Sequence, residues 1–217
     1  MIVIAIVVTC VLALSLVACD KPWEKWFNKD KDTANHEIAD ANAFDSAINQ
    51  IDTSSVTIQG RISGDEIEGG SFNIERLGNH SAHAHITTSG STVNEVYEEF
   101  VAEGSWREYT KTGNAWGYES KSSSAVDSLI DIFALGIFGD ISNFSNYTYD
   151  ANDKSYKASV NYNNGYSASH YEITLKFTDG CLVYLHYIET YGTDKHSESE
   201  FTFSKHNATS FTFPTVG

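Results

Sequence analysis

Positive charge is scarce in this sequence of 217 residues. Fourteen lysines and arginines stand against 29 aspartates and glutamates, which leaves a formal net charge of −15 at pH 7. A protein that binds nucleic acid needs a basic face for the phosphates, so the composition argues against that partner. It also argues against a domain that lies flat on anionic lipid. The acidity instead predicts a soluble domain that stays monomeric.

Cysteine is also rare, with three residues in the whole chain. A scaffold dense in disulfides is therefore excluded, and a chain of this length must depend on an apolar core. Cys10 and Cys19 lie within or beside the N-terminal apolar segment. Cys181 opens the apolar run 182–185, and we interpret it as a small core residue.

Catalytic motifs are missing too. The sequence contains no Gly-x-Ser-x-Gly, no phosphate-binding loop and no Rossmann fingerprint. Glu66 and Glu68 would share one face of a strand, and glycosidases use paired carboxylates. In a chain this acidic, a solvated surface explains the pair better, so we predict that the protein is not an enzyme.

The first eighteen residues carry no charged side chain, and most of them are apolar. The run is short for a spanning helix, which needs about 20 residues. It ends in Leu16-Val17-Ala18-Cys19, directly before a polar segment that begins at Asp20. This tetrapeptide resembles the lipobox of bacterial lipoproteins. The resemblance implies that residues 1–18 are a signal peptide and that Cys19 carries a diacylglyceryl (palmitate-type) anchor.

The basic residues that usually open a signal peptide are absent, which leaves two alternatives. The natural start lies upstream of Met1, or the N-terminal amine alone supplies the positive charge. A separate alternative to the lipoprotein is an uncleaved membrane span in which Cys19 has no role. Both place the rest of the chain outside the cytoplasm, so we predict a protein of the cell envelope, held at a membrane. Asp20 resembles an inner-membrane retention signal, but inner and outer membrane remain open.

The remaining chain divides into a polar tether, residues 19–40, and one domain, residues 41–217. Apolar residues at spacings of three and four predict a helix over Ala39–Ile51. From Val56 to Tyr118 the period changes to two, with Gly and Asn between the runs, which predicts an antiparallel meander. An apolar helix is predicted from Ser122 to about Phe138.

A second meander is predicted after this helix, from Tyr147 to Phe213. Its last two strands are expected at residues 200–203 and 210–213. Helix, strands, helix and strands together predict an α+β fold that is mainly antiparallel β. We expect one strongly curved sheet, a half-barrel, wrapped over the N-terminal and the central helix, because both apolar helix faces would then be buried. Two small domains are the alternative.

This order resembles the LolA-like fold of lipoprotein carriers and lipid-transfer lipoproteins. The resemblance begins at Ala43-Phe44, continues into Val56-Thr57-Ile58-Gln59-Gly60, and ends near Phe211-Thr212-Phe213-Pro214. It depends on the order of elements over about 175 residues rather than on a motif, so no ligand-facing residue can be carried over. It implies that an acyl chain binds between a half-barrel and its helices.

The expected function is therefore non-covalent binding of a lipid or another hydrophobic ligand, for transfer or sensing. Four residues of the central helix are candidate lid or cavity residues: Val126, Leu129, Ile132 and Phe133. The alternative is a filled core in a protein-interaction or envelope-structural module without a small ligand.

His83 and His85 are the remaining candidates for chemistry. On a strand they point to one face, about 7 Å apart, and such a pair can share a zinc ion. A third ligand would have to come from elsewhere, either His80 or an acidic residue. The sequence supplies no carboxylate or cysteine at ligand spacing, and two solvated histidines on an open sheet face explain the pair as well. We therefore predict neither a metal nor a cofactor, and keep a metal-dependent hydrolase only as a weak alternative.

Overall fold

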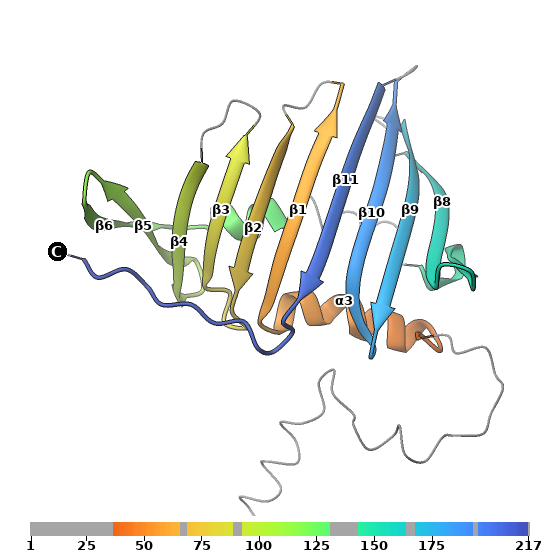
Figure 1. The fold of residues 1–217 in the computed structure, drawn as a ribbon, viewed down its shortest axis with the longest axis horizontal. Coiled ribbons are helices and arrows are strands. Elements are labelled where there is room, and N and C mark those ends of the chain that lie inside the picture. Colours follow the sequence, from red (N-terminus) through yellow and green to blue (C-terminus); the bar gives the residue numbers. More distant parts are fainter. Residues whose placement is uncertain are drawn as a thin grey trace, which may run out of the picture.

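A single antiparallel sheet of eleven strands dominates the molecule (Figure 1). The computed structural model describes residues 37–65, 69–88, 93–130, 143–163, 168–192 and 195–216. The strand order is β6-β5-β4-β3-β2-β1-β11-β10-β9-β8-β7, so the sheet is open, with β6 and β7 at its edges. The predicted α+β fold with one mainly antiparallel sheet is confirmed.

Two meanders make up this sheet, and in the sequence one precedes and the other follows a central helix. The first part of the chain contains α3 (Ala41–Thr53), β1 (Val56–Gly64), β2 (Gly70–Arg76), β3 (Ala82–Thr88), β4 (Val93–Ala102), β5 (Ser105–Thr112) and β6 (Ala115–Lys121). The second contains α4 (Ala125–Ile130), the short 3-10 helix η2 (Phe144–Asn146), β7 (Thr148–Asp150), β8 (Ser155–Asn163), β9 (Ala168–Thr178), β10 (Cys181–Tyr191) and β11 (Lys195–Ser204). The meanders join where β1 pairs with β11.

Helix α3 begins two residues later than predicted because Asp40 caps it. The Asp40 side chain accepts a hydrogen bond from the backbone N–H of Ala43 at 2.9 Å, which satisfies one of the unpaired donors of the first turn. The apolar face is buried as expected: Phe44, Ala47, Ile48 and Ile51. Among the described residues, no helix is both long and apolar enough to cross a lipid bilayer.

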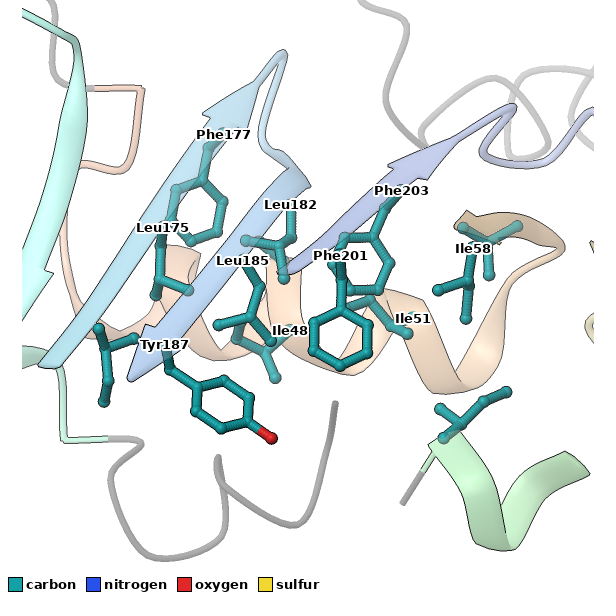
Figure 2. Packing of buried hydrophobic residues seen from close by; sticks show 14 of the residues in the cluster. Ile48, Ile51, Ile58, Leu175, Phe177, Leu182, Leu185, Tyr187, Phe201 and Phe203 are labelled. Carbon is teal, nitrogen blue, oxygen red and sulfur yellow. The ribbon is translucent and has the colours of Figure 1, made fainter. Parts of the chain in front are cut away.

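The core lies between α3 and the middle strands of the sheet. In Figure 2, Ile48 and Ile51 of the helix face a layer of side chains from β9, β10 and β11. That layer includes Leu175, Phe177, Leu182, Leu185, Phe201 and Phe203, all of which are at least 96% buried. Cys181, expected as a small core residue, is 2% exposed.

The chain already packs against the sheet before α3 begins, within the last residues of the expected tether 19–40. Ile38 is 1% exposed. The Tyr156 hydroxyl on β8 accepts from the Ile38 N–H at 3.1 Å and donates to the Ile38 carbonyl at 3.0 Å. This pair of hydrogen bonds fixes the start of the domain against the sheet.

Gly60 lies at the middle of β1, where the apolar alternation of the sequence is interrupted. A Cβ atom at this position would lie 2.4 Å from Cζ of Phe72 and 2.9 Å from Cδ1 of Phe201. The two rings, whose centroids are 5.7 Å apart, therefore occupy the space that a side chain would need. Glycine is required here for ring packing across the sheet.

The predicted last strand, residues 210–213, is wrong. After β11 the chain turns away at Lys205 and Asn207, which adopt positive φ angles of 52° and 57°, and no ladder continues. The tail then runs past the ends of β1 to β4 (Figure 1). The Phe211 ring contacts His83, and the Phe213 ring packs on Tyr109 of the same face. The alternating pattern of residues 210–213 therefore reflects packing of one side of the tail on the sheet rather than strand pairing.

Arg76, at the end of β2, connects the sheet to both helices. Its side chain is 2% exposed. Nη1 donates to the Ile51 and Asp52 carbonyls of α3 at 2.9 and 2.8 Å, and Nη2 donates to the Asp52 carboxylate at 2.8 Å. Nε donates to the carboxylate of Asp127 in α4 at 3.0 Å. One guanidinium thus satisfies the C-terminal carbonyls of α3 and holds α4 nearby.

We expect Arg76→Met to lower the free energy of unfolding by about 3 kcal/mol, because it leaves a partly buried carboxylate and helix carbonyls without their partner. This loss of stability lies at the low end of the range for breaking buried ion pairs, because the Asp52 side chain is half exposed. Arg61, which is 71% exposed beside Glu200, provides the control. Arg61→Met should change stability by less than about 1 kcal/mol. Equal losses in urea unfolding would contradict this role for Arg76.

Candidate functional site

The face of the sheet that α3 covers, here called the inner face, is apolar across most of its width. Strand register places one row of side chains across the middle of this face. From β3 to β8 the row is Ile86, Phe72, Gly60, Phe201, Leu185, Leu175 and Tyr156. Such a continuous apolar row can pack on a helix or line a site for an acyl chain.

A cluster of polar side chains follows on the same face, further from the β9–β10 turn. We call Tyr171, Tyr187, Glu189, Ser197 and Ser199 the inner-face polar cluster. The Tyr171 hydroxyl donates to Oε1 of Glu189 at 2.8 Å, and the Ser197 hydroxyl to Oε2 at 3.4 Å. Tyr187 lies opposite Ser199 in the β10–β11 register. The two serines are 3% and 1% exposed, so this cluster is deeply placed.

Burial raises the pKa of the Tyr171 and Tyr187 hydroxyls, and the Glu189 carboxylate adds to the effect. Both tyrosines are therefore protonated at neutral pH, and Tyr171 donates its hydroxyl proton to Glu189. The cluster presents donors and one carboxylate beside an apolar surface. That combination suits a ligand with an apolar body and a polar end.

Three apolar side chains at the margins of this inner surface are only partly buried. They are Ile86 on β3, Val160 on β8 and Tyr171 on β9. Val160 and Tyr171 are direct cross-strand partners, and Ile86 is the partner of Phe72. The inner face therefore retains accessible apolar area at two separate places, one on each side of the β1–β11 pair.

Of the four residues expected to form a lid or cavity wall, one is described in full. Val126 of α4 is 1% exposed and belongs to the core cluster. The Leu129 side chain, Ile132 and Phe133 lie outside the described residues, as do Cys19 and the Glu66–Glu68 pair. Ser124, directly before α4, accepts a hydrogen bond from the Asp127 N–H at 2.7 Å.

Glu98 on β4 is a buried partner of α4 that the sequence did not reveal. It is 1% exposed. Its carboxylate accepts from the Ser124 hydroxyl and from the N–H groups of Ala125 and Val126, at 2.9 and 3.3 Å for the latter two. Burial raises the pKa of this carboxyl, and the three hydrogen bonds act in the opposite direction.

The opposite, outer face carries the two histidines singled out above, and a third group joins them. Nε2 of His83 and Nε2 of His85 lie 3.3 and 3.9 Å from Oε1 of Glu95. Nδ1 of His83 lies 2.9 Å from Oε2 of Glu75. Tyr97 stacks on the His83 ring, with centroids 4.1 Å apart, and donates to Glu95 at 3.2 Å.

Glu95 could have been identified as a third ligand only from the pairing of neighbouring strands, because spacing along a single strand does not bring it to the histidines. Glu95 is ten residues from His85, but the two are direct cross-strand partners in the β3–β4 register. Glu75 is likewise opposite His83 in the β2–β3 register. Each carboxylate therefore reaches the histidines only through pairing of neighbouring strands.

Glu98→Gln should become more favourable relative to the wild type as pH rises from about 4 to about 7. The native state holds the Glu98 proton more tightly than the unfolded chain does, because its folded pKa is raised. The wild type therefore loses stability as pH rises past the unfolded value of about 4.3, and the amide does not. Urea unfolding across this range measures the difference, and a difference independent of pH would refute the assignment.

Comparison with known sequences adds no relative. No protein-family model matches this chain, and no curated protein is significantly similar to it.

Proposed function

We propose that this protein is an exported lipoprotein, anchored through Cys19, that binds a hydrophobic ligand on the inner face of its sheet. The ligand is a lipid or acyl chain, held without covalent chemistry for transfer or sensing. The observation that carries the proposal is the composition of the inner face: an apolar row across the strands beside the inner-face polar cluster.

Partial burial at the margins supports the same function. Ile86, Val160 and Tyr171 keep accessible apolar area on the face where α3 and α4 pack. Contacts with an acyl chain would remove this area from water, at about 25 cal/mol per Å². Val160 is the cross-strand partner of Tyr171, which belongs to the polar cluster, so the polar end of a ligand would be closest to β9 and β10.

The chemistry of the cluster restricts the head group. Glu189 brings a negative charge, and it already accepts hydrogen bonds from Tyr171 and Ser197. A free fatty-acid carboxylate would be repelled by Glu189, whereas an amide, a hydroxyl or an amine could donate to it. We therefore propose a neutral or cationic amphiphile over a fatty acid.

The finer features of the fold belong to this proposal as well. The observed order of N-terminal helix, six strands, central helix and five strands is the one on which the resemblance to LolA-like proteins depends. We propose that the sheet curves as a half-barrel over its helices and that the candidate residues of the central helix face the ligand. A filled-core interaction module is the outcome to be distinguished.

Val160→Trp should reduce binding of a fluorescent monoacylglycerol to the full-length protein in detergent by about tenfold or more, a loss of about 1.4 kcal/mol. The indole would fill the space beside Tyr171 that the acyl chain needs. Asn161→Trp is the matched control, because its exposed side chain points to the opposite face of the same strand. Its affinity should equal that of the wild type.

A fluorescent fatty acid in the same assay tests the head-group proposal and should bind more weakly. Organic extraction followed by mass spectrometry would identify any amphiphile that copurifies. If the protein carries no extractable lipid and binds neither probe, the carrier function is refuted and the interaction module remains. Equal loss in both tryptophan variants would place the ligand away from the inner face.

Cys19→Ser should abolish lipidation. The intact mass of the wild type, expressed with its own N-terminus in a bacterial host, should correspond to a chain that begins at Cys19 and carries acyl groups. The variant should keep residues 1–18 and gain no acyl mass, because the thiol is the acceptor. An acylated variant, or a wild type that keeps its first eighteen residues, would contradict the anchor.

A further inference from the structure

We propose that His83, His85 and Glu95 form a binding site for one zinc-class divalent metal ion on the outer face of the sheet. The site is separate from the proposed ligand site, since alternation along β3 places His83 and His85 on the face opposite Ala82 and Ala84 of the core. It uses two imidazoles and one carboxylate, the donor types that zinc prefers with nitrogen and oxygen ligands.

The distances between the donor atoms fit this ion before it binds. Ligands at about 2.0–2.1 Å from a tetrahedral zinc lie about 3.3 Å from one another. Nε2 of His83 is 3.3 Å from Oε1 of Glu95, and Nε2 of His85 is 3.9 Å from it. The donor atoms of all three residues lie within 4.8 Å of one another. Reductions of these separations by up to about 1.5 Å would bring all three donor atoms to the spacing of a tetrahedral site.

Glu75 supplies the outer partner that zinc-binding histidines require. Its Oε2 lies 2.9 Å from Nδ1 of His83. With the proton on Nδ1 and directed to Glu75, the Nε2 lone pair of His83 faces the site. Asn73, opposite His85 in the β2–β3 register, has a buried side-chain oxygen without a hydrogen-bond partner within the described part of the chain.

Access and rigidity also fit a site for an ion. The side chains of His85 and Glu95 are 43% and 37% exposed, so an ion can enter from solvent, whereas His83 is 12% exposed. His83 is held between Tyr97 and the tail residue Phe211, whose ring centroid lies 5.9 Å away. Three protein ligands leave one position of a tetrahedral ion for water or a substrate, as in catalytic zinc sites.

The competing arrangement is a salt bridge without metal, in which a charged His83 lies between Glu75 and Glu95. The two arrangements differ in proton content, because metal binding requires neutral imidazoles and releases protons. The titratable groups that face the histidines are Glu75 from β2 and Glu95 and Tyr97 from β4, and the tail contributes an uncharged ring.

The test is calorimetric titration of zinc chloride into full-length protein, purified without a His tag and stripped with chelator. We expect one zinc per chain, and substitution by cobalt should give the intense visible absorption of a four-coordinate ion. His85→Gln and Glu95→Gln should each weaken zinc binding by at least about 100-fold. Glu75→Gln should weaken it by about tenfold, as for an outer partner.

His186→Gln is the matched control. His186 lies on another strand, with its Nε2 2.9 Å from Oε1 of Glu198, and no further ligand joins this pair in the described part of the chain. Its zinc affinity should equal that of the wild type. Absence of stoichiometric binding, or loss of binding in the control as large as in His85→Gln, would overturn the proposal. Circular dichroism of each variant verifies that the sheet is intact.

Discussion

The antiparallel ladder between β1 and β11 is the constraint on which the rest of the structure depends. It extends from Thr57 opposite Ser204 to Gly64 opposite Ser197, and it joins the first and last strands of the chain. Every other neighbouring pair of strands is consecutive in sequence, so without this ladder the meanders would form two separate sheets. Pairing so distant in sequence costs loop-closure entropy, which the core beneath β1 and β11 offsets.

Alternation along the strands then gives the molecule two surfaces with different chemistry. The inner face is apolar beneath α3 and becomes polar toward Glu189, which suits an amphiphile. The outer face carries His83, His85 and their carboxylates, with the C-terminal tail beside them. Because each residue of a strand faces one side only, the proposed ligand site and the proposed metal site can occupy opposite faces of one sheet without sharing a residue.

Two buried charges connect the helices to the first meander. Arg76 satisfies the C-terminal carbonyls of α3 and the carboxylate of Asp127, and Glu98 accepts from the first N–H groups of α4. Both are more than 95% buried and fully hydrogen-bonded to their helix partners, so neither is an unpaired charge in the core. The short helix α4 thus lies between a strand arginine and a strand glutamate, which fix where the central segment leaves the sheet.

The sequence by itself determined the type of α3 and of most strands, and the face that α3 buries. Spacings of three and four around Phe44 predicted α3, and alternation predicted the meanders, because these periods follow from local backbone geometry. Tertiary structure alone decided which distant residues meet. Glu95 reaches His85 through strand register, Glu98 caps a helix 26 residues away, and Phe211 packs on a face instead of extending the sheet. An apolar residue at every second position predicts that one side of a segment is buried, but it does not identify the part of the molecule that covers that side.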